Sequence, residues 1–179
     1  MRRYGRGMVW GGVVVLVAIV VAGVVALWPE DEEKPKIPVR AREYKPTQAC
    51  LLTPASGLAD AQSAQAWAGL QDASARTHVQ VRYLAAAGED TPGNAGPYLA
   101  SLAVSGCQTV VVAGDTGVQA AVQEAHSFPK VQFLLLQGSQ GSTPTTSAPA
   151  GGNTKTLTVT NPTEARAQVA SELEQLTKG

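Results

Sequence analysis

Residues 8–28, MVWGGVVVLVAIVVAGVVALW, form a long run without a single charged side chain. About 20 such residues are enough to cross the hydrocarbon core of a bilayer as a helix. Three arginines lie in residues 1–7, and four acidic residues follow the run from Glu30 to Glu33. Since basic residues are kept on the cytoplasmic side, we expect residues 1–7 to be a cytoplasmic tail. Residues 8–28 would then be a single-pass signal anchor in the cell membrane, with the main domain extracytoplasmic.

A cleaved signal peptide is the alternative reading of this run, because Val24 and Ala26 are small residues ahead of a possible cleavage point. Signal peptides usually have an apolar region of about 7 to 15 residues, which favours an uncleaved anchor here. Lipid attachment at Cys50 is disfavoured, because the preceding residues, Thr47-Gln48-Ala49, lack the leucine that usually begins a lipobox. The anchor is therefore expected to contact membrane lipid directly.

The next segment, residues 29–48, is predicted to be a stalk, because four prolines alternate there with charged residues. Such composition favours an extended chain without regular hydrogen bonding. Outside the membrane the sequence has 11 basic and 14 acidic residues once the three N-terminal arginines are set aside. No basic field is present to attract nucleic acid, which we do not expect as a partner.

After the stalk, short apolar strands alternate with amphipathic helices, a pattern typical of an α/β domain with a parallel sheet. Residues 79–83 alternate between apolar and polar, as expected for an edge strand, while the uniformly apolar TVVVA of 109–113 predicts a central strand. The predicted strands are 49–53, 79–83, 109–113, 131–136 and 156–160, and the predicted helices are 58–76, 95–104, 118–126 and one that follows Asn161.

Right-handed crossovers between these strands give the order 2-1-3-4-5 of a single doubly wound, flavodoxin-like parallel sheet. The α/β lobe is predicted to occupy residues 49–137, interrupted by a Gly/Ser/Thr/Pro-rich flexible loop at 138–154. Residues 155–179 would add the final strand and helix to the same lobe. In that helix, Asn161 is expected to be the N-cap, with Pro162 at the first position and Glu164 reaching back.

Ligands of such sheets bind where the carboxyl ends of the strands meet. The alternative is purely structural: Ser56 and Asp60 would cap helix N-termini, and residues 114–117 would form only a turn. Both readings stay open at this stage. The candidate ligand-binding residues are Thr53, Ser56 and Asp60 after the first strand, Gly114, Asp115 and Thr116 after the third, and Gln137 after the fourth.

Cys50 and Cys107 are the only cysteines, and both stand at the beginning of strands expected to be neighbours. In an oxidising compartment this predicts a disulfide. Closing the loop between Cys50 and Cys107 would stabilise the fold by about 4 kcal/mol in the chain-entropy model. Two buried free thiols are the alternative.

Patterns that indicate catalysis, a metal or a cofactor were not found. His78 and His126 are the only histidines, and neither stands in a metal-like spacing with cysteine or paired carboxylates. The sequence also lacks GxSxG, HExxH and P-loop motifs. We therefore expect no enzymatic activity, no metal and no cofactor, and we expect each histidine to end a helix.

Three segments carry a resemblance to a known family: GLADAQSAQAWAGLQDA, YLASLAVSGCQTVVVAG and VQEAHSFPKVQFLLLQG. Across residues 50–137 they resemble the first lobe of the basic membrane protein (BMP) family of ABC-transporter solute-binding proteins, which have the type I periplasmic-binding-protein fold. The resemblance implies a membrane-held receptor that captures a small, nucleoside-like solute for transport or sensing and passes it to an ABC permease.

Two departures from the family pattern bear on this implied function. The Gly57-Leu58-Ala59-Asp60 turn keeps the glycine and the aspartate but lacks the aromatic residue that would stack on a base. By resemblance, only Asp60 carries over as a polar ligand contact. The family binds its ligand between two lobes, so one lobe would need a second copy of the chain or a partner protein. The alternative is a structural or protein-interaction domain that kept the fold without a ligand pocket.

Overall fold

Parallel strands and helices alternate along residues 44–138 and 152–178, which are the residues that the computed structural model describes. After β1, β2, β3 and β5 the chain continues into a helix that packs against the sheet, and residues 139–151, between β4 and β5, lie outside the described residues. The elements are β1 (Gln48–Thr53), η1 (Gly57–Ala59), α2 (Ala61–Thr77), β2 (Gln80–Ala85), α3 (Pro92–Val104), β3 (Thr109–Val112), α4 (Asp115–Glu124), η2 (Ala125–Ser127), β4 (Gln132–Gly138), β5 (Thr154–Val159) and α5 (Pro162–Leu176).

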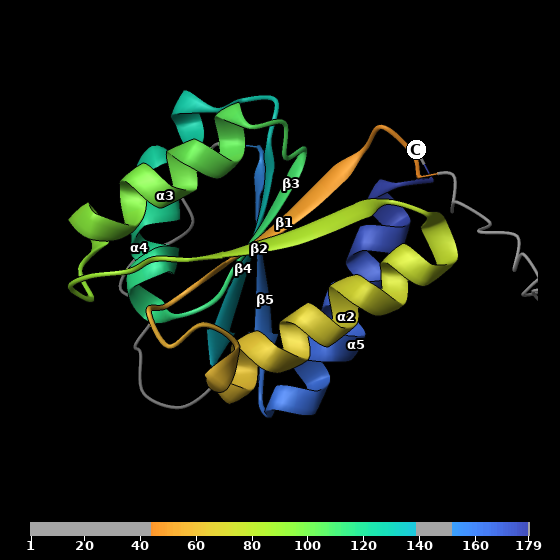
Figure 1. Cartoon of the computed structure of the whole chain (residues 1–179), viewed down its shortest axis with the longest axis horizontal. Coiled ribbons are helices and arrows are strands. Elements are labelled where there is room, and N and C mark those ends of the chain that lie inside the picture. Colours follow the sequence, from red (N-terminus) through yellow and green to blue (C-terminus); the bar gives the residue numbers. More distant parts are fainter. Residues whose placement is uncertain (1–43, 139–151, 179) are drawn as a thin grey trace, which may run out of the picture. The chain divides into compact units, whose positions relative to one another are not determined.

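The five strands form one parallel sheet in the order β2-β1-β3-β4-β5, which confirms the predicted topology. Helices α2 and α5 cover one face of this sheet, and α3 and α4 cover the other (Figure 1). This arrangement follows from right-handed crossovers, which send the chain to one side of β1 first and to the other side afterwards. The three-layer α/β fold class is thus confirmed.

Each face of the sheet has its own apolar core, because side chains alternate along every strand. In β1, Leu51 points into the core under α2 and α5, together with Leu70 and Leu173. The neighbouring Leu52 points into the opposite core with Leu99. Strand β3 is buried along its whole length, whereas the edge strand β2 has no fully buried residue. Both exposure predictions are confirmed.

The starts of three helices differ from the prediction. Helix α3 begins at Pro92, three residues before the predicted start at Ala95. The expected helix 58–76 is divided, because Asp60 has an extended backbone (φ −72°, ψ 131°) that ends η1 and begins α2. Helix α4 begins at Asp115, not at Val118, so residues 115–117 form its first turn and are not a separate turn. Gly114 allows this abrupt start because it adopts a positive φ of 87°, which is accessible to glycine.

A disulfide joins Cys50 of β1 to Cys107, just before β3, as predicted. The two Cα atoms are 5.9 Å apart, because β1 and β3 are neighbours in the sheet. Both cysteines are buried. Since its sulfur is bonded to Cys107, Cys50 is not available for attachment of a lipid.

The predicted membrane span at residues 8–28 lies outside the described residues, as do most of the stalk and most of the predicted flexible loop. Among the residues that are described, no helix combines the length and the apolar character needed to cross a bilayer.

Helices α2 and α5 are in close contact at Gly69, so we predict that Gly69→Ala destabilises the domain. A Cβ atom at this position would lie 2.5 Å from the backbone oxygen of Arg166, and a backbone atom cannot move aside as a side chain can. We expect a loss of about 1–3 kcal/mol in the free energy of unfolding, measured by urea denaturation. Gly93→Ala, in α3, is the matched control because nothing lies within 4 Å of its added Cβ. Equal stability of both variants would contradict the close contact.

Candidate functional site

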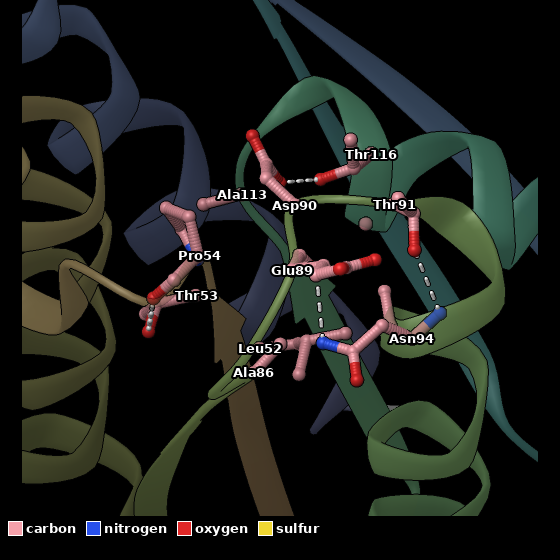
Figure 2. Close-up of a pocket in the computed structure, with 12 residues that line it drawn as sticks. Leu52, Thr53, Pro54, Ala86, Glu89, Asp90, Thr91, Asn94, Ala113 and Thr116 are labelled. Carbon is pink, nitrogen blue, oxygen red and sulfur yellow. Dashed lines mark hydrogen bonds between the residues drawn. The ribbon is translucent and has the colours of Figure 1, made fainter.

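A small crevice lies at the carboxyl ends of β1, β2 and β3, at the switch point where the chain reverses its direction across the sheet (Figure 2). Ligands of doubly wound folds bind at this position. The crevice is therefore the candidate ligand-binding site. The crevice is lined by Leu52, Thr53, Pro54, Ala86, Glu89, Asp90, Thr91, Asn94, Ala95, Ala113, Thr116 and Gly117.

The crevice is very small. Its cavity volume is about 10 Å³, which leaves room for about one water molecule. Pockets that hold small organic ligands typically have volumes of about 300–1,000 Å³. Leu52, Thr53 and Ala113 close the floor and are almost completely buried. In this conformation the crevice does not admit a molecule of nucleoside size.

Polar groups around the crevice are bonded to one another. The Asn94 amide nitrogen Nδ2 donates to the backbone oxygens of Ala87 (2.8 Å) and Glu89 (2.9 Å). The Thr91 hydroxyl accepts from the Asn94 backbone N–H at 3.2 Å, and the Thr116 hydroxyl donates to an Asp90 carboxylate oxygen. Figure 2 shows the bonds of Asn94 to Glu89 and Thr91 and the bond between Thr116 and Asp90. They hold the loop between β2 and α3 in place.

Of the predicted ligand residues, the structure brings only Thr53 and Thr116 to the crevice. The Thr53 hydroxyl is buried and donates to the backbone oxygen of Pro54 at 3.1 Å. Gly114 and Asp115 stand at the start of α4 but do not line the crevice, and Gln137 is a half-buried residue near the end of β4.

Ser56 and Asp60 also lie outside the crevice lining, at the N-termini of two helices. The Asp60 carboxylate accepts a hydrogen bond from the Ser63 backbone N–H at 2.7 Å, so Asp60 is the N-cap of α2. Ser56 stands at the N-cap of η1 without a capping bond from its side chain. The structural reading is thus confirmed for Asp60, and its role as a ligand contact remains a prediction.

Sequence reasoning missed the contribution of the β2–α3 loop, which it treated only as a connection. This loop and the start of α3 supply Glu89, Asp90, Thr91 and Asn94 to the crevice. A usable signal was present, since the end of β2 lies at the same edge as the ends of β1 and β3. Thr91-Pro92 followed by Asn94 is also a helix-start pattern, with Thr91 as the cap.

The ionisable groups discussed next lie outside the crevice, at helix ends or in an ion pair. Across 44–138 and 152–178, no cluster of three or more His, Cys, Asp or Glu side chains has a metal-binding arrangement. His78 is the C-cap of α2, and His126 lies in η2. On the far side of the sheet from α3, the Arg166 guanidinium bonds both oxygens of Asp72 (2.6 and 3.0 Å). These hydrogen bonds and the charge of Arg166 hold the pKa of Asp72 below its usual value, despite some desolvation.

Comparisons with known proteins add information about the fold alone. No protein-family model matches the chain, and no curated protein does so. Among solved structures, the chain is similar to the crystal structure of a fragment named "putative lipoprotein" from Peptoclostridium difficile 630, with a TM-score of 0.55 and 12% sequence identity. The similarity covers 71% of this chain and 98% of that fragment. At this identity the likeness shows a shared fold and carries no residue-level correspondence.

Because Asp60 caps α2, we predict that Asp60→Ala lowers the free energy of unfolding by about 1 kcal/mol. The substitution leaves the Ser63 N–H without its 2.7 Å acceptor. Asp60→Asn is the matched control, since asparagine is an equally good N-cap and should preserve stability. Urea denaturation of the three proteins measures the effect. Unchanged stability of Asp60→Ala would show that the cap contributes nothing.

Proposed function

We propose that this chain is a membrane-anchored, extracytoplasmic protein-interaction module that keeps one lobe of a solute-binding-protein-like fold without a working solute pocket. The observation that carries the proposal is the filled crevice at the switch point, whose volume is about 10 Å³. The side chains of Asp90, Thr91, Asn94 and Thr116 in its lining form hydrogen bonds with other groups of the protein. The switch-point crevice therefore does not serve as a solute pocket, and the proposed interaction takes place at the outer surface.

Several observations support the membrane-anchored location. The uncharged run at residues 8–28 has the length of a span, and the flanking charges favour a cytoplasmic N-terminus. The buried Cys50–Cys107 disulfide is compatible with an oxidising, extracytoplasmic compartment. The similar crystal structure carries a lipoprotein name, which is also compatible with attachment at a membrane.

The strongest surface candidate for a partner is the outer edge of β2. This edge strand, QVRYLA, contains neither proline nor lysine, the residues that often block pairing with another chain. Tyr83 is 48% exposed and makes an edge-to-face contact with Trp67, with ring centroids 5.3 Å apart. Tyrosine is enriched in protein interfaces, and a free sheet edge can accept a further strand.

A second candidate function is a solute half-site completed by another lobe. The position of the crevice at the switch point favours it, as does the resemblance to the first lobe of the BMP family. In this case a second copy of the chain, or a partner such as an ABC permease, would supply the opposing surface. Residues around the mouth, including Asp90 and Thr116, would then contact a small polar solute.

A thermal-shift screen of the full-length protein in detergent micelles tests the primary proposal against the second. Nucleosides, sugars and amino acids would each be added at millimolar concentration. A ligand at 100 times its dissociation constant adds about 2.7 kcal/mol of stability, which would raise the Tm of a domain of this size by several degrees. We predict no shift. A reproducible shift with any of these solutes would favour the half-site instead.

Site-specific photo-crosslinking tests the surface of β2. We predict that a photoreactive phenylalanine analogue in place of Tyr83 gives a discrete crosslinked species in intact membranes, because Tyr83 is an exposed residue of β2, the edge strand of the sheet within the described residues. The same analogue in place of Lys130, an exposed residue between η2 and β4, is the control. The mass of the product separates a second copy of this chain from a different partner. Equal, diffuse crosslinking at both positions would argue against an interface at β2.

A further inference from the structure

We propose that the Cys50–Cys107 disulfide is a thiol–disulfide exchange site, in which Arg82 stabilises the thiolates that form on reduction. The site lies towards the amino ends of the strands, whereas the crevice lies at their carboxyl ends. It is therefore separate from the function proposed above. The reaction partner is an external dithiol.

One guanidinium group spans both sulfurs. Arg82 is the register partner of Cys50 in the β1–β2 ladder. Its Nε donates to the Cys50 sulfur at 3.4 Å, and its Nη2 donates to the Cys107 sulfur at 3.3 Å. Nη2 also bonds the Ser105 hydroxyl, which fixes the guanidinium over the disulfide. The polar neighbours at this end of β1, Gln48 and Gln108, are uncharged and bonded to each other.

The contact with Arg82 stabilises the reduced state more than it stabilises the oxidised state. A disulfide sulfur is neutral and accepts hydrogen bonds weakly, so the contact with Arg82 stabilises the oxidised form only slightly. A thiolate is charged, and hydrogen bonds between oppositely charged groups are about twice as strong as neutral ones. Arginine keeps its charge at any accessible pH. Cationic neighbours of this kind are typical of reactive cysteines, which are also partly exposed. Because Cys50 and Cys107 are both buried, exchange at this disulfide requires local opening of the fold.

The exchange step can be written with all electrons accounted for. A thiolate of the dithiol attacks the sulfur of Cys107, and the electron pair of the broken S–S bond moves to Cys50, whose thiolate faces Nε of Arg82. The second thiolate of the dithiol then attacks the dithiol's first sulfur, which is bonded to Cys107 in the mixed disulfide. Cys107 is released as a thiolate beside Nη2 of Arg82. The dithiol leaves as a disulfide, and the protein gains two electrons.

Cys107 is the better point of attack because of its place in the fold. It lies between α3 and β3, in a loop where its neighbours Gly106 and Gln108 are exposed. Cys50 lies within β1, which is paired on both sides with β2 and β3. Exposing Cys107 breaks its backbone bond to the Leu102 oxygen, whereas exposing Cys50 requires β1 to separate from β2 or β3.

Redox equilibration of the full-length protein in detergent micelles tests the proposal. Wild type, Arg82→Met and Lys130→Met would be equilibrated at pH 7 with mixtures of reduced and oxidised dithiothreitol, quenched with acid, alkylated and weighed. We expect the equilibrium constant for reduction to fall about tenfold in Arg82→Met. Lys130→Met, which removes an exposed cation elsewhere, should match wild type. An unchanged or higher constant in Arg82→Met overturns the proposal.

A second measurement separates thiolate stabilisation from a general loss of structure. The reduced proteins would be alkylated with iodoacetamide between pH 6 and 10, with circular dichroism to verify that they remain folded. We expect the half-maximal rate at a lower pH in wild type than in Arg82→Met. Arg82→Lys, which keeps the charge without the two-pronged geometry, should lie between them and replaces Arg82→Met if that variant unfolds. Identical pH profiles for wild type and the folded variant overturn the proposal.

Discussion

Burial of the central strands on both faces is the constraint on which the rest of this structure depends. Strands β1 and β3 lie between two helical layers, and every residue of β3 is buried. Burial of large aliphatic side chains contributes about 1.5–3 kcal/mol each, so these strands dominate the stability of the lobe. A strand that is apolar on both faces can only be central, and this fixes β2 and β5 at the edges.

Strand β1 contributes side chains to both apolar cores, and it carries different chemical groups at its two ends. At its amino end, Cys50 is bonded to Cys107 and contacted by Arg82. At its carboxyl end, Thr53 and Pro54 form part of the crevice. The same strand therefore holds the disulfide and the crevice at opposite ends, with an apolar interior between them. Changes at one end reach the other only through buried packing.

The topology could be predicted from the sequence because it depends on burial, and burial leaves a pattern in the chain. The uniform TVVV of β3 and the alternation around Tyr83 each had one interpretation, and the strand order followed from the handedness of crossovers. The start of α2 could not be placed, since Asp60 and Leu58 are both compatible with a helix. The extended backbone of Asp60 ends η1, and the hydrogen bond from the Ser63 N–H to the Asp60 carboxylate stabilises it.

The candidate site was harder to predict because its size depends on how side chains pack, not on which strand they follow. The switch point was expected from the strand order, and Thr53 and Thr116 do lie there. Whether a space remains between them is decided by Asn94 and the β2–α3 loop, whose hydrogen bonds join residues up to 26 positions apart in the sequence. Sequence periodicity predicts strands and helices, but it does not predict whether a loop folds across the crevice and fills it.

The cost of opening this crevice also distinguishes the two proposed functions. A solute would have to displace the bonds of Asn94 to Ala87 and Glu89, and the bond of Thr116 to Asp90. Each neutral bond contributes about 0.5–1.5 kcal/mol and the bond to the Asp90 carboxylate about 1.5–3 kcal/mol, so a solute that replaced them imperfectly would lose affinity by amounts of this order. A partner that pairs with the edge of β2 meets no such cost, because the outer backbone groups of an edge strand are unpaired within the sheet. The energetic balance therefore favours recognition at the edge over capture in the crevice.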